Sequence, residues 1–158
     1  MKAAENNDME IAELLSVQRV VHGADIVSKK KVLELLSQLL ADSLDTLNQE
    51  EIFGGLLSRE RLGSTGLGHG VAIPHARIAG LKKATAAFVQ LHNGINYDAI
   101  DQQPVDLLFA LLVPADATEE HLQVLATLAE KFNNIELREQ LRQATSNEEL
   151  QALVQKPL

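Results

Sequence analysis

A run of glycine and hydroxyl residues that leads into a histidine is the part of this sequence best suited to chemistry. Four glycines, one serine and one threonine fall within residues 63–70, and a short β-branched run then reaches Pro74 and His75. Glycine lets backbone N–H groups approach an anion closely, as concave phosphate-binding turns require. Imidazole can accept and return a group near neutral pH, and the proline fixes the angle at which His75 enters. The pattern predicts a histidine that does chemistry on or with a phosphate.

His75 is the leading candidate for that chemistry. Neutral imidazole has one nitrogen with a lone pair that can attack a phosphoryl group, while the other nitrogen keeps its proton, held by an acceptor. The phosphoramidate that results is labile and transfers its group onward readily, as a carrier requires. The alternative is a histidine at a strand end whose ring is satisfied by backbone hydrogen bonds. Spacing alone leaves both interpretations open.

The hydroxyl residues of the glycine-rich run also have two interpretations. Ser64, Thr65 and Gly66 could donate hydroxyl or backbone hydrogen bonds to a phosphate, or they could only shape the turn. The glycines do not follow the G-x-G-x-x-G spacing of dinucleotide-binding turns, and no G-x-x-x-x-G-K-[ST] loop is present. ATP and NAD binding therefore have no support, and no cofactor is expected.

Two further histidines lie where they could contribute to a site. His121 lies three residues after Thr118, the expected cap of a helix, and borders the apolar face of that helix. It is either a packed surface histidine or an anion ligand, because helix N-termini favour anions. His69 is interpreted as an exposed loop residue, and His22 and His92 as structural or surface residues.

A metal-dependent hydrolase is the competing hypothesis from another class of protein. His69, His75 and His121 could together hold zinc, because three histidines can form a zinc-ligand set. However, the sequence has no helical His-x-x-x-His pair, and no acidic ligand stands beside His75. No metal is therefore expected.

The elements that must position these residues follow from hydrophobic spacing, capping residues and turn signals. We expect helices at about 11–15, 28–41, 48–61, 118–132, 135–144 and 146–154, with caps at Ser28, Asn48 and Thr118 and a capping box at Ser146–Glu149. We expect strands at about 20–21, 71–73, 85–91 and 105–113, with turn chemistry at His92-Asn93-Gly94. A short strand or loop should follow that turn. Gly63 is expected to end the helix that Asn48 begins.

The fold class follows from how these elements alternate. Residues 105–113 are almost continuously apolar, which predicts a central strand buried on both faces. Helices interleaved with such strands predict a three-layer α/β fold, with helices on both faces of the sheet. The turn at Asn93-Gly94 indicates a hairpin, so the sheet should be mixed rather than wholly parallel. We expect a flexible N-terminus at residues 1–9 and one domain over residues 10–156.

The composition limits the classes of function that the chain can serve. It has 158 residues, 46% of them hydrophobic, a net charge of −8 and no cysteine. The lack of cysteine excludes disulfides, thiolate catalysis and cysteine-based zinc sites. The acidic balance disfavours nucleic acid, and Lys29-Lys30-Lys31 is interpreted as the solvated end of a helix. No apolar run could cross a bilayer and the first residues form no signal peptide, so we expect a cytoplasmic protein without membrane insertion.

Two sets of residues carry a resemblance to a known family. Glu60, six further residues and then Leu67–Ala76 (LGHGVAIPHA) resemble the active-site histidine signature of IIA components of the bacterial phosphotransferase system, mannitol/fructose type. The resemblance narrows to the nitrogen-regulatory branch of that family at residues 63–66, 88–91, 97–101 and 104–116. The similarity runs from about residue 14 to residue 154, nearly the whole chain.

The resemblance implies the same three-layer fold and a phosphotransferase component that takes a phosphoryl group on Nε2 of His75 from an HPr-like phosphohistidine protein. It also implies that His121 donates a hydrogen bond to the phosphate and that Arg59 stabilises its charge. Arg61 is interpreted as a solvated residue. In the nitrogen branch the phosphorylation state regulates partners, typically potassium-transport or sensor-kinase components, and no sugar need be transported.

Two alternatives stay open beside this reading. Within the family, the chain could be a sugar-specific IIA component of the fructose or mannitol type that passes phosphate to a separate IIB protein. In a different class, it could be a regulatory binding module that kept the fold and is not phosphorylated. A docking carrier would need an apolar surface around His75, for which Leu67, Val71 and Ile78 are candidates, although each could equally belong to the core. The sequence also leaves a weak homo-oligomer open.

Overall fold

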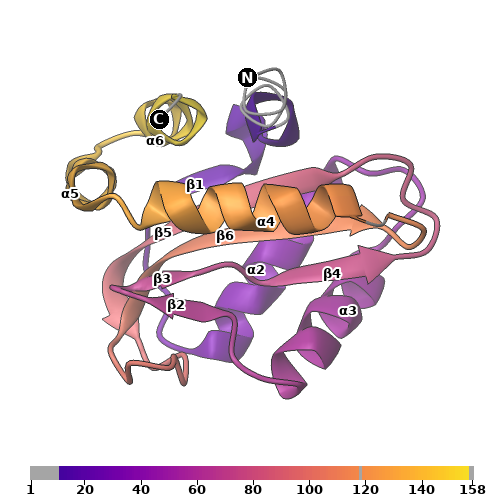
Figure 1. Ribbon diagram of the computed structural model, residues 1–158, viewed down its shortest axis with the longest axis horizontal. Helices are drawn as coiled ribbons and strands as arrows, with labels where there is room; N and C mark the ends of the chain where they lie inside the picture. Colours follow the sequence, from indigo (N-terminus) through magenta and orange to yellow (C-terminus); the bar gives the residue numbers. More distant parts are fainter. Residues whose placement is uncertain (1–10, 118, 157–158) are drawn as a thin grey trace.

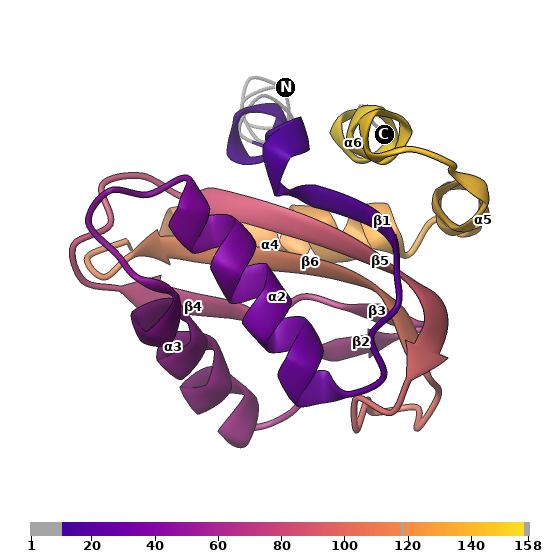
Figure 2. The same ribbon diagram turned by 180° about the vertical axis from the view of Figure 1, so that it is seen from behind.

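A mixed sheet covered by helices on both faces makes up the part of the molecule that the structure describes. The structure is a computed structural model, and it describes residues 11–117 and 119–156, apart from the side chains of residues 119–121. The predicted flexible segment 1–9 and the predicted cap Thr118 lie outside these residues. Helices lie in front of and behind the sheet in Figure 1 and Figure 2. This arrangement confirms the predicted fold class.

The described residues form six strands in one sheet. The strands are β1 (Val20–Ala24), β2 (Gly66–Gly68), β3 (Val71–Ala72), β4 (His75–Ile78), β5 (Thr85–Ile95) and β6 (Val105–Pro114). Their order across the sheet is β1-β5-β6-β3-β2, and β4 also pairs with β6. The predicted strand at 71–73 is therefore followed at once by a second strand that contains His75.

Strand β6 is the element on which the rest of the sheet is assembled. It pairs antiparallel with β5 on one side and parallel with β3 and β4 on the other, so β3 and β4 follow one another along it. Its side chains are buried from Leu107 to Val113, as a continuous apolar run predicts. The register places His75 opposite Leu111. The buried strand thus fixes the position of the candidate reactive residue.

The helices divide between the two faces. Helices α2 (Lys29–Asp42) and α3 (Gln49–Arg61) cover one face, as Figure 2 shows. Helix α4 (Glu119–Phe132) lies on the opposite face, and α5 (Ile135–Gln143) and α6 (Asn147–Gln155) follow it (Figure 1). Residues 11–14 are helical and precede a 3₁₀ turn at Val17–Arg19, which lies beside α6. Each face of the sheet therefore has an apolar core of its own.

Local caps fix where α2 and α3 begin and where α3 ends, and they match the prediction. The Ser28 hydroxyl accepts a hydrogen bond from the Lys31 amide at 3.2 Å. Asn48 and Glu51 form a reciprocal capping box at the start of α3. Gly63 leaves the end of α3 with a φ of 151°, a value that L side chains rarely adopt. These side-chain and backbone contacts are local, which explains why spacing along the chain predicted them.

The capping box predicted for α6 is only half formed. The Ser146 hydroxyl accepts from the Glu149 amide at 3.0 Å, as a cap should. The Glu149 carboxylate, however, accepts from the Thr145 amide at 3.0 Å instead of the Ser146 amide. The reciprocal contact has thus moved by one residue, and the Thr145 hydroxyl donates to the same carboxylate oxygen at 3.4 Å.

The predicted turn at His92-Asn93-Gly94 is wrong. These residues lie inside β5, which continues to Ile95 and pairs there with Val105. Glycine is needed at position 94 because a Cβ there would lie 2.7 Å from the Cβ of Pro104. The chain reverses through residues 96–104 instead, and β5 and β6 are antiparallel as a result. The mixed sheet was predicted correctly, but the Asn-Gly pair marks a close contact and not the reversal.

Candidate active site

His75 begins β4 and lies half-buried beside β6. Its Nδ1 lies 2.8 Å from the carbonyl oxygen of Ile73. A carbonyl can only accept, so Nδ1 carries the proton and the lone pair of the neutral ring lies on Nε2. The two interpretations that the sequence left open are therefore compatible. The backbone hydrogen bond selects the tautomer that a nucleophilic Nε2 requires.

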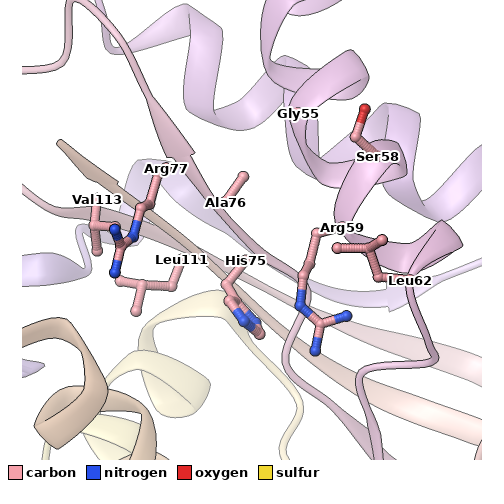
Figure 3. Close-up of a pocket in the computed structure, with 9 residues that line it drawn as sticks. All are labelled: Gly55, Ser58, Arg59, Leu62, His75, Ala76, Arg77, Leu111 and Val113. Carbon is pink, nitrogen blue, oxygen red and sulfur yellow. The ribbon is translucent and has the colours of Figure 1, made fainter. Parts of the chain in front are cut away.

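A pocket of about 420 Å³ opens beside His75 (Figure 3). One wall comes from the second half of α3, including Ser58 and Arg59, and the other from β4 and β6. Ala76 also lines the pocket, and Ile78 lies in the core under α2 and α3, because successive strand residues alternate between the faces. The pocket has room for a tetrahedral anion next to the imidazole.

Arg59 lies in the last turn of α3 and lines this pocket. Its side chain is half-buried, and its Nη1 donates to the carbonyl oxygen of Gly63 at 2.8 Å. Figure 3 shows the guanidinium beside the His75 ring. A guanidinium in this place can bridge two phosphoryl oxygens and offset their charge. Arg61 is exposed, in keeping with its interpretation as a solvated residue.

Arg77 is a second cation of the pocket, and the sequence analysis did not single it out. It lies two residues after His75 on β4, so the two side chains leave the strand on the same face. Figure 3 shows Arg77 on the side of His75 opposite to Arg59. The period of a strand could have identified it, had β4 been predicted. The imidazole therefore has an arginine on either side.

The predicted phosphate loop, Ser64, Thr65 and Gly66, follows the end of α3. The buried Thr65 donates its amide to both carboxylate oxygens of Glu60, at 3.2 Å each, and its hydroxyl to the same carboxylate. The Ser64 hydroxyl accepts from the Gly66 amide at 3.1 Å. A Cβ on Gly66 would lie 2.6 Å from the Cβ of Ala99, so packing requires glycine. These groups are engaged within the protein, and a contact with phosphate stays a prediction.

Glu60 is a buried carboxylate that the sequence analysis treated only as the first residue of the motif. It forms an ion pair with Lys29, with 3.0 Å between Oε1 and Nζ. The Lys29 ammonium also lies 4.4 Å from the centroid of the Tyr97 ring and donates to the Tyr97 carbonyl at 3.1 Å. Burial, together with the charge of Glu60, raises the pKa of Tyr97, so its phenol stays protonated.

The interpretation of the lysine triplet is wrong for its first member. Lys30 and Lys31 are exposed, as a solvated helix end requires, whereas Lys29 is only partly exposed and paired. The difference arises because the first residue of α2 lies next to the end of α3, where Glu60 is buried. Adjacency of two helix ends is a tertiary feature that a charge run does not reveal.

His121 lies in the first turn of α4, and its side chain lies outside the described residues. Its predicted hydrogen bond to phosphate therefore stays a prediction. The other two histidines without a motif, His22 and His92, are exposed, in keeping with their interpretation as surface residues.

His69 lies in the tight connection between β2 and β3, with a φ of 59° between two glycines that also have positive φ. Its backbone makes the contacts: the amide donates to Asp101 at 3.0 Å, and the carbonyl accepts from Arg142 at 2.6 Å. The residue is exposed, as the sequence predicted, and it lines a different pocket from His75. Over the described ranges, no three His, Cys, Asp or Glu residues gather where they could hold a metal ion.

None of the three apolar residues considered for the rim lines the pocket beside His75. Leu67 is 45% exposed but lines a different pocket together with His69, whereas Val71 and Ile78 are only 2% and 8% exposed and belong to the core, the alternative that the sequence left open. Leu62, which the sequence analysis did not propose, is 85% exposed and lines the pocket next to Arg59. Its position one residue beyond α3 leaves it without a helix or strand to pack against.

Comparison with known proteins identifies the family. Residues 13–156 match the family described as the phosphoenolpyruvate-dependent sugar phosphotransferase system, EIIA 2. The chain belongs to this family. A nitrogen regulatory protein of Klebsiella oxytoca is 42% identical over 152 residues, which cover 94% of this chain and 93% of that protein.

Two solved structures agree with this assignment. The nitrogen regulatory protein IIA-Ntr from Neisseria meningitidis matches with a TM-score of 0.87 and 45% identity, over 91% of this chain and 98% of that one. IIA mannitol from Escherichia coli matches with a TM-score of 0.74 and 22% identity, over 89% of this chain and 98% of that one, and shows a shared fold. The resemblance to nitrogen-regulatory members, drawn from residues 63–66, 88–91, 97–101 and 104–116, is confirmed.

Membership of the EIIA 2 family gives this chain a phosphotransferase role, with phosphocarrier proteins as its partners. Among the helices that the structure describes, none combines the length and the apolar character needed to cross a bilayer.

Proposed function

We propose that this chain is a phosphocarrier of the nitrogen-regulatory phosphotransferase system. In this proposal His75 accepts a phosphoryl group on Nε2 from an HPr-like phosphohistidine protein in the cytoplasm. The phosphorylation state of the chain then regulates partner proteins, such as potassium-transport or sensor-kinase components. Similarity to nitrogen regulatory proteins over nearly the whole chain supports the choice of branch.

One observation carries the chemistry: the 2.8 Å contact between His75 Nδ1 and the Ile73 carbonyl. With the proton held on Nδ1, the Nε2 lone pair attacks the phosphorus atom of the donor. The N–P bond of the donor breaks as the new bond to Nε2 forms, and the donor imidazole leaves with the bonding electron pair. Such a transfer depends on positioning and on charge stabilisation.

Arg59 supplies charge stabilisation in this proposal. Its guanidinium lies in the pocket beside His75, where the phosphoryl oxygens come to lie during transfer. His121 donates a hydrogen bond to the same phosphate and is not itself modified. Its place in the first turn of α4 supports that role, because a helix N-terminus favours an anion.

In this proposal the turn at Ser64, Thr65 and Gly66 shapes the pocket and does not bind phosphate directly. Its polar groups bond to Glu60 and to one another, so the turn supports the pocket by its shape. A direct contact between this turn and phosphate would require some of those hydrogen bonds to break. The geometry therefore favours shaping over binding.

The alternative within the family is a sugar-specific IIA component that passes its phosphoryl group to a separate IIB protein. The family description, which names the sugar phosphotransferase system, supports it. A fructose-type or mannitol-type IIB protein added to the phosphorylated chain distinguishes the two functions. Transfer to IIB indicates the sugar-specific component, and a phosphoryl group that stays on this chain indicates the regulatory one.

The experiment that tests the proposal is an intact-mass measurement. The chain is incubated with phosphoenolpyruvate, enzyme I and the HPr-like carrier of the nitrogen branch, and in parallel with those of the sugar branch. We expect one acid-labile phosphoryl group on the wild type and on His92→Ala, and none on a folded His75→Ala variant. His92 is a suitable control because it is an exposed histidine on β5. Absence of transfer from both carriers would leave the non-phosphorylated binding module as the better account.

A further inference from the structure

The buried carboxylate of Glu60 lies at the centre of a set of contacts that the proposed transfer does not use. Glu60 belongs to the last turn of α3, and its side chain is only 2% exposed. Its charge is paired with Lys29 at 3.0 Å. A buried ion pair contributes little to stability compared with well-packed apolar side chains. Its presence next to the candidate active site therefore calls for another physical role.

The first contact of Glu60 leads to His75. Thr65 donates its amide and its hydroxyl to the Glu60 carboxylate. The Thr65 carbonyl accepts from the Ile73 amide at 3.0 Å, and the Ile73 carbonyl in turn lies 2.8 Å from Nδ1 of His75. An unbroken series of hydrogen bonds thus connects the carboxylate to the nitrogen whose protonation sets the tautomer.

The second contact of Glu60 leads to Arg59. The Glu60 carboxylate holds Thr65, and the Glu60 carbonyl accepts from the Gly63 amide at 3.1 Å. Both ends of the turn after α3 are therefore fixed to the same residue. The Gly63 carbonyl at the apex of this turn accepts from Nη1 of Arg59 at 2.8 Å. The position of the guanidinium thus depends on the shape of the turn.

We propose that Glu60 is a positioning residue for phosphoryl transfer. Through Thr65 and the turn that follows α3, its carboxylate orients the imidazole of His75 and the guanidinium of Arg59 at the same time. The inference rests on the proposed function, since it assigns Glu60 a role in that reaction. Lys29 pairs with the carboxylate and also contacts the Tyr97 ring, and the Tyr97 hydroxyl lies 3.2 Å from the Thr65 hydroxyl.

The Glu60→Gln variant tests this role with little change of shape. An amide has one oxygen where the carboxylate has two, so its NH₂ group faces donors on one side. Thr65 loses an acceptor and Lys29 loses its counter-charge. Misplacement of reacting groups by about 1 Å lowers rates by roughly 100-fold. We expect the rate constant for phosphorylation of His75 at saturating carrier to fall about 10- to 100-fold, with little change in KM.

A destabilised control separates positioning from stability. Leu150 is fully buried in α6, far along the chain from the pocket, and it is not among the residues that line the pocket. Leu150→Ala should lower the melting temperature without lowering the rate constant. If Glu60→Gln loses no more rate than Leu150→Ala does, Glu60 has only a structural role and the proposal is overturned.

A second readout needs no phosphoryl donor. Nitrogen-15 chemical shifts of the His75 ring report which nitrogen carries the proton. We expect the wild type to hold the proton on Nδ1 and Glu60→Gln to show a mixture of tautomers. Unchanged tautomer shifts in the variant would overturn the connection to His75. If the wild type accepts no phosphoryl group, the proposed function is refuted. The tautomer measurement still decides whether Glu60 orients the His75 ring.

A variant pair at Thr65 keeps the test usable if Glu60→Gln does not fold. Thr65→Val keeps the amide and the ion pair but removes the hydroxyl, and Thr65→Ser restores it. We expect a lower rate constant and mixed tautomers in Thr65→Val, with recovery in Thr65→Ser. Equal rates and equal tautomer shifts in the two variants would contradict the proposal.

Discussion

The ammonium of Lys29 lies 3.0 Å from the carboxylate of Glu60 and joins the first residue of α2 to the last turn of α3. The Tyr97 ring packs against the same cation. The side chain of Glu60 is 2% exposed and that of Lys29 is 24% exposed, so water screens the pair only in part. The contact joins the start of α2 to the end of α3, next to the turn whose Gly63 carbonyl accepts from Arg59.

Removal of the cation should therefore destabilise the protein. Lys29→Met leaves the Glu60 carboxylate buried without a counter-charge, and we expect the free energy of unfolding to fall by about 1–3 kcal/mol. Urea denaturation at neutral pH measures the change. Lys30→Met is the matched control, because its side chain is exposed, and it should change the free energy by less than about 0.5 kcal/mol. Equal changes in the free energy of unfolding of the two variants would show that the ion pair does not contribute to stability.

Arg59 and Arg61 provide a matched pair for the charge-stabilising role. Arg59→Ala should lower the rate constant of His75 phosphorylation by about 100-fold, because the pocket loses a donor aimed at the phosphoryl oxygens. Arg59→Lys should recover only part of the rate, since an ammonium cannot bridge two oxygens. Arg61→Ala should leave the rate unchanged. A comparable loss in Arg61→Ala would mean that the general positive charge of this region, and not the place of Arg59, matters.

Two glycines should respond in opposite ways to substitution by alanine. A Cβ on Gly66 would lie 2.6 Å from the Cβ and 3.0 Å from the Cα of Ala99, so Gly66→Ala should cost about 1–3 kcal/mol of stability. A Cβ on Gly54, in α3, would meet nothing within 4 Å. Gly54→Ala should stabilise the protein by about 1 kcal/mol, because alanine favours a helix. Denaturant midpoints test both, and a stable Gly66→Ala variant would contradict the packing at Ala99.

Replacement of His69 by asparagine should lower neither the stability of the protein nor the rate of His75 phosphorylation. Its contacts with Asp101 and Arg142 come from its backbone, and its φ of 59° is one that asparagine tolerates well. We expect His69→Asn to keep the melting temperature and the rate of His75 phosphorylation. A marked loss of rate in this variant would instead assign the imidazole of His69 a part in the chemistry.

Asp101 should make stability depend on pH in a specific direction. Hydrogen bonds from the backbone amides of Gln103 and His69 hold the pKa of Asp101 below its usual range. A carboxyl with a lowered folded pKa stabilises the protein above its unfolded pKa, about 3.9, and this contribution is lost as the pH falls through the folded value. The stability difference between the wild type and Asp101→Asn should be present at neutral pH and shrink in acid. A difference that does not vary with pH would contradict this role.

The local features of the sequence determined much of the fold. Ser28 and Asn48 cap their helices because capping needs only a side chain and the amides of the next turn. The apolar run of β6 required burial on both faces whatever its neighbours. The motif around His75 was sufficient to predict a phosphotransferase component through its resemblance to the IIA signature, which is carried within one short segment.

Only the tertiary structure decided how distant residues meet at the site. The sequence predicts a turn at Gly94, whereas in the structure this residue lies in β5 and packs against Pro104. The charge run predicts a solvated Lys29, whereas in the structure the start of α2 lies against the end of α3 and Lys29 pairs with Glu60. The hydrogen bonds from Glu60 through Thr65 and Ile73 to His75 connect the end of α3 to the start of β4, a connection that periodicity does not reveal. Chain-local interactions are encoded by spacing, whereas burial and pairing across elements exist only once the sheet and its helices have packed.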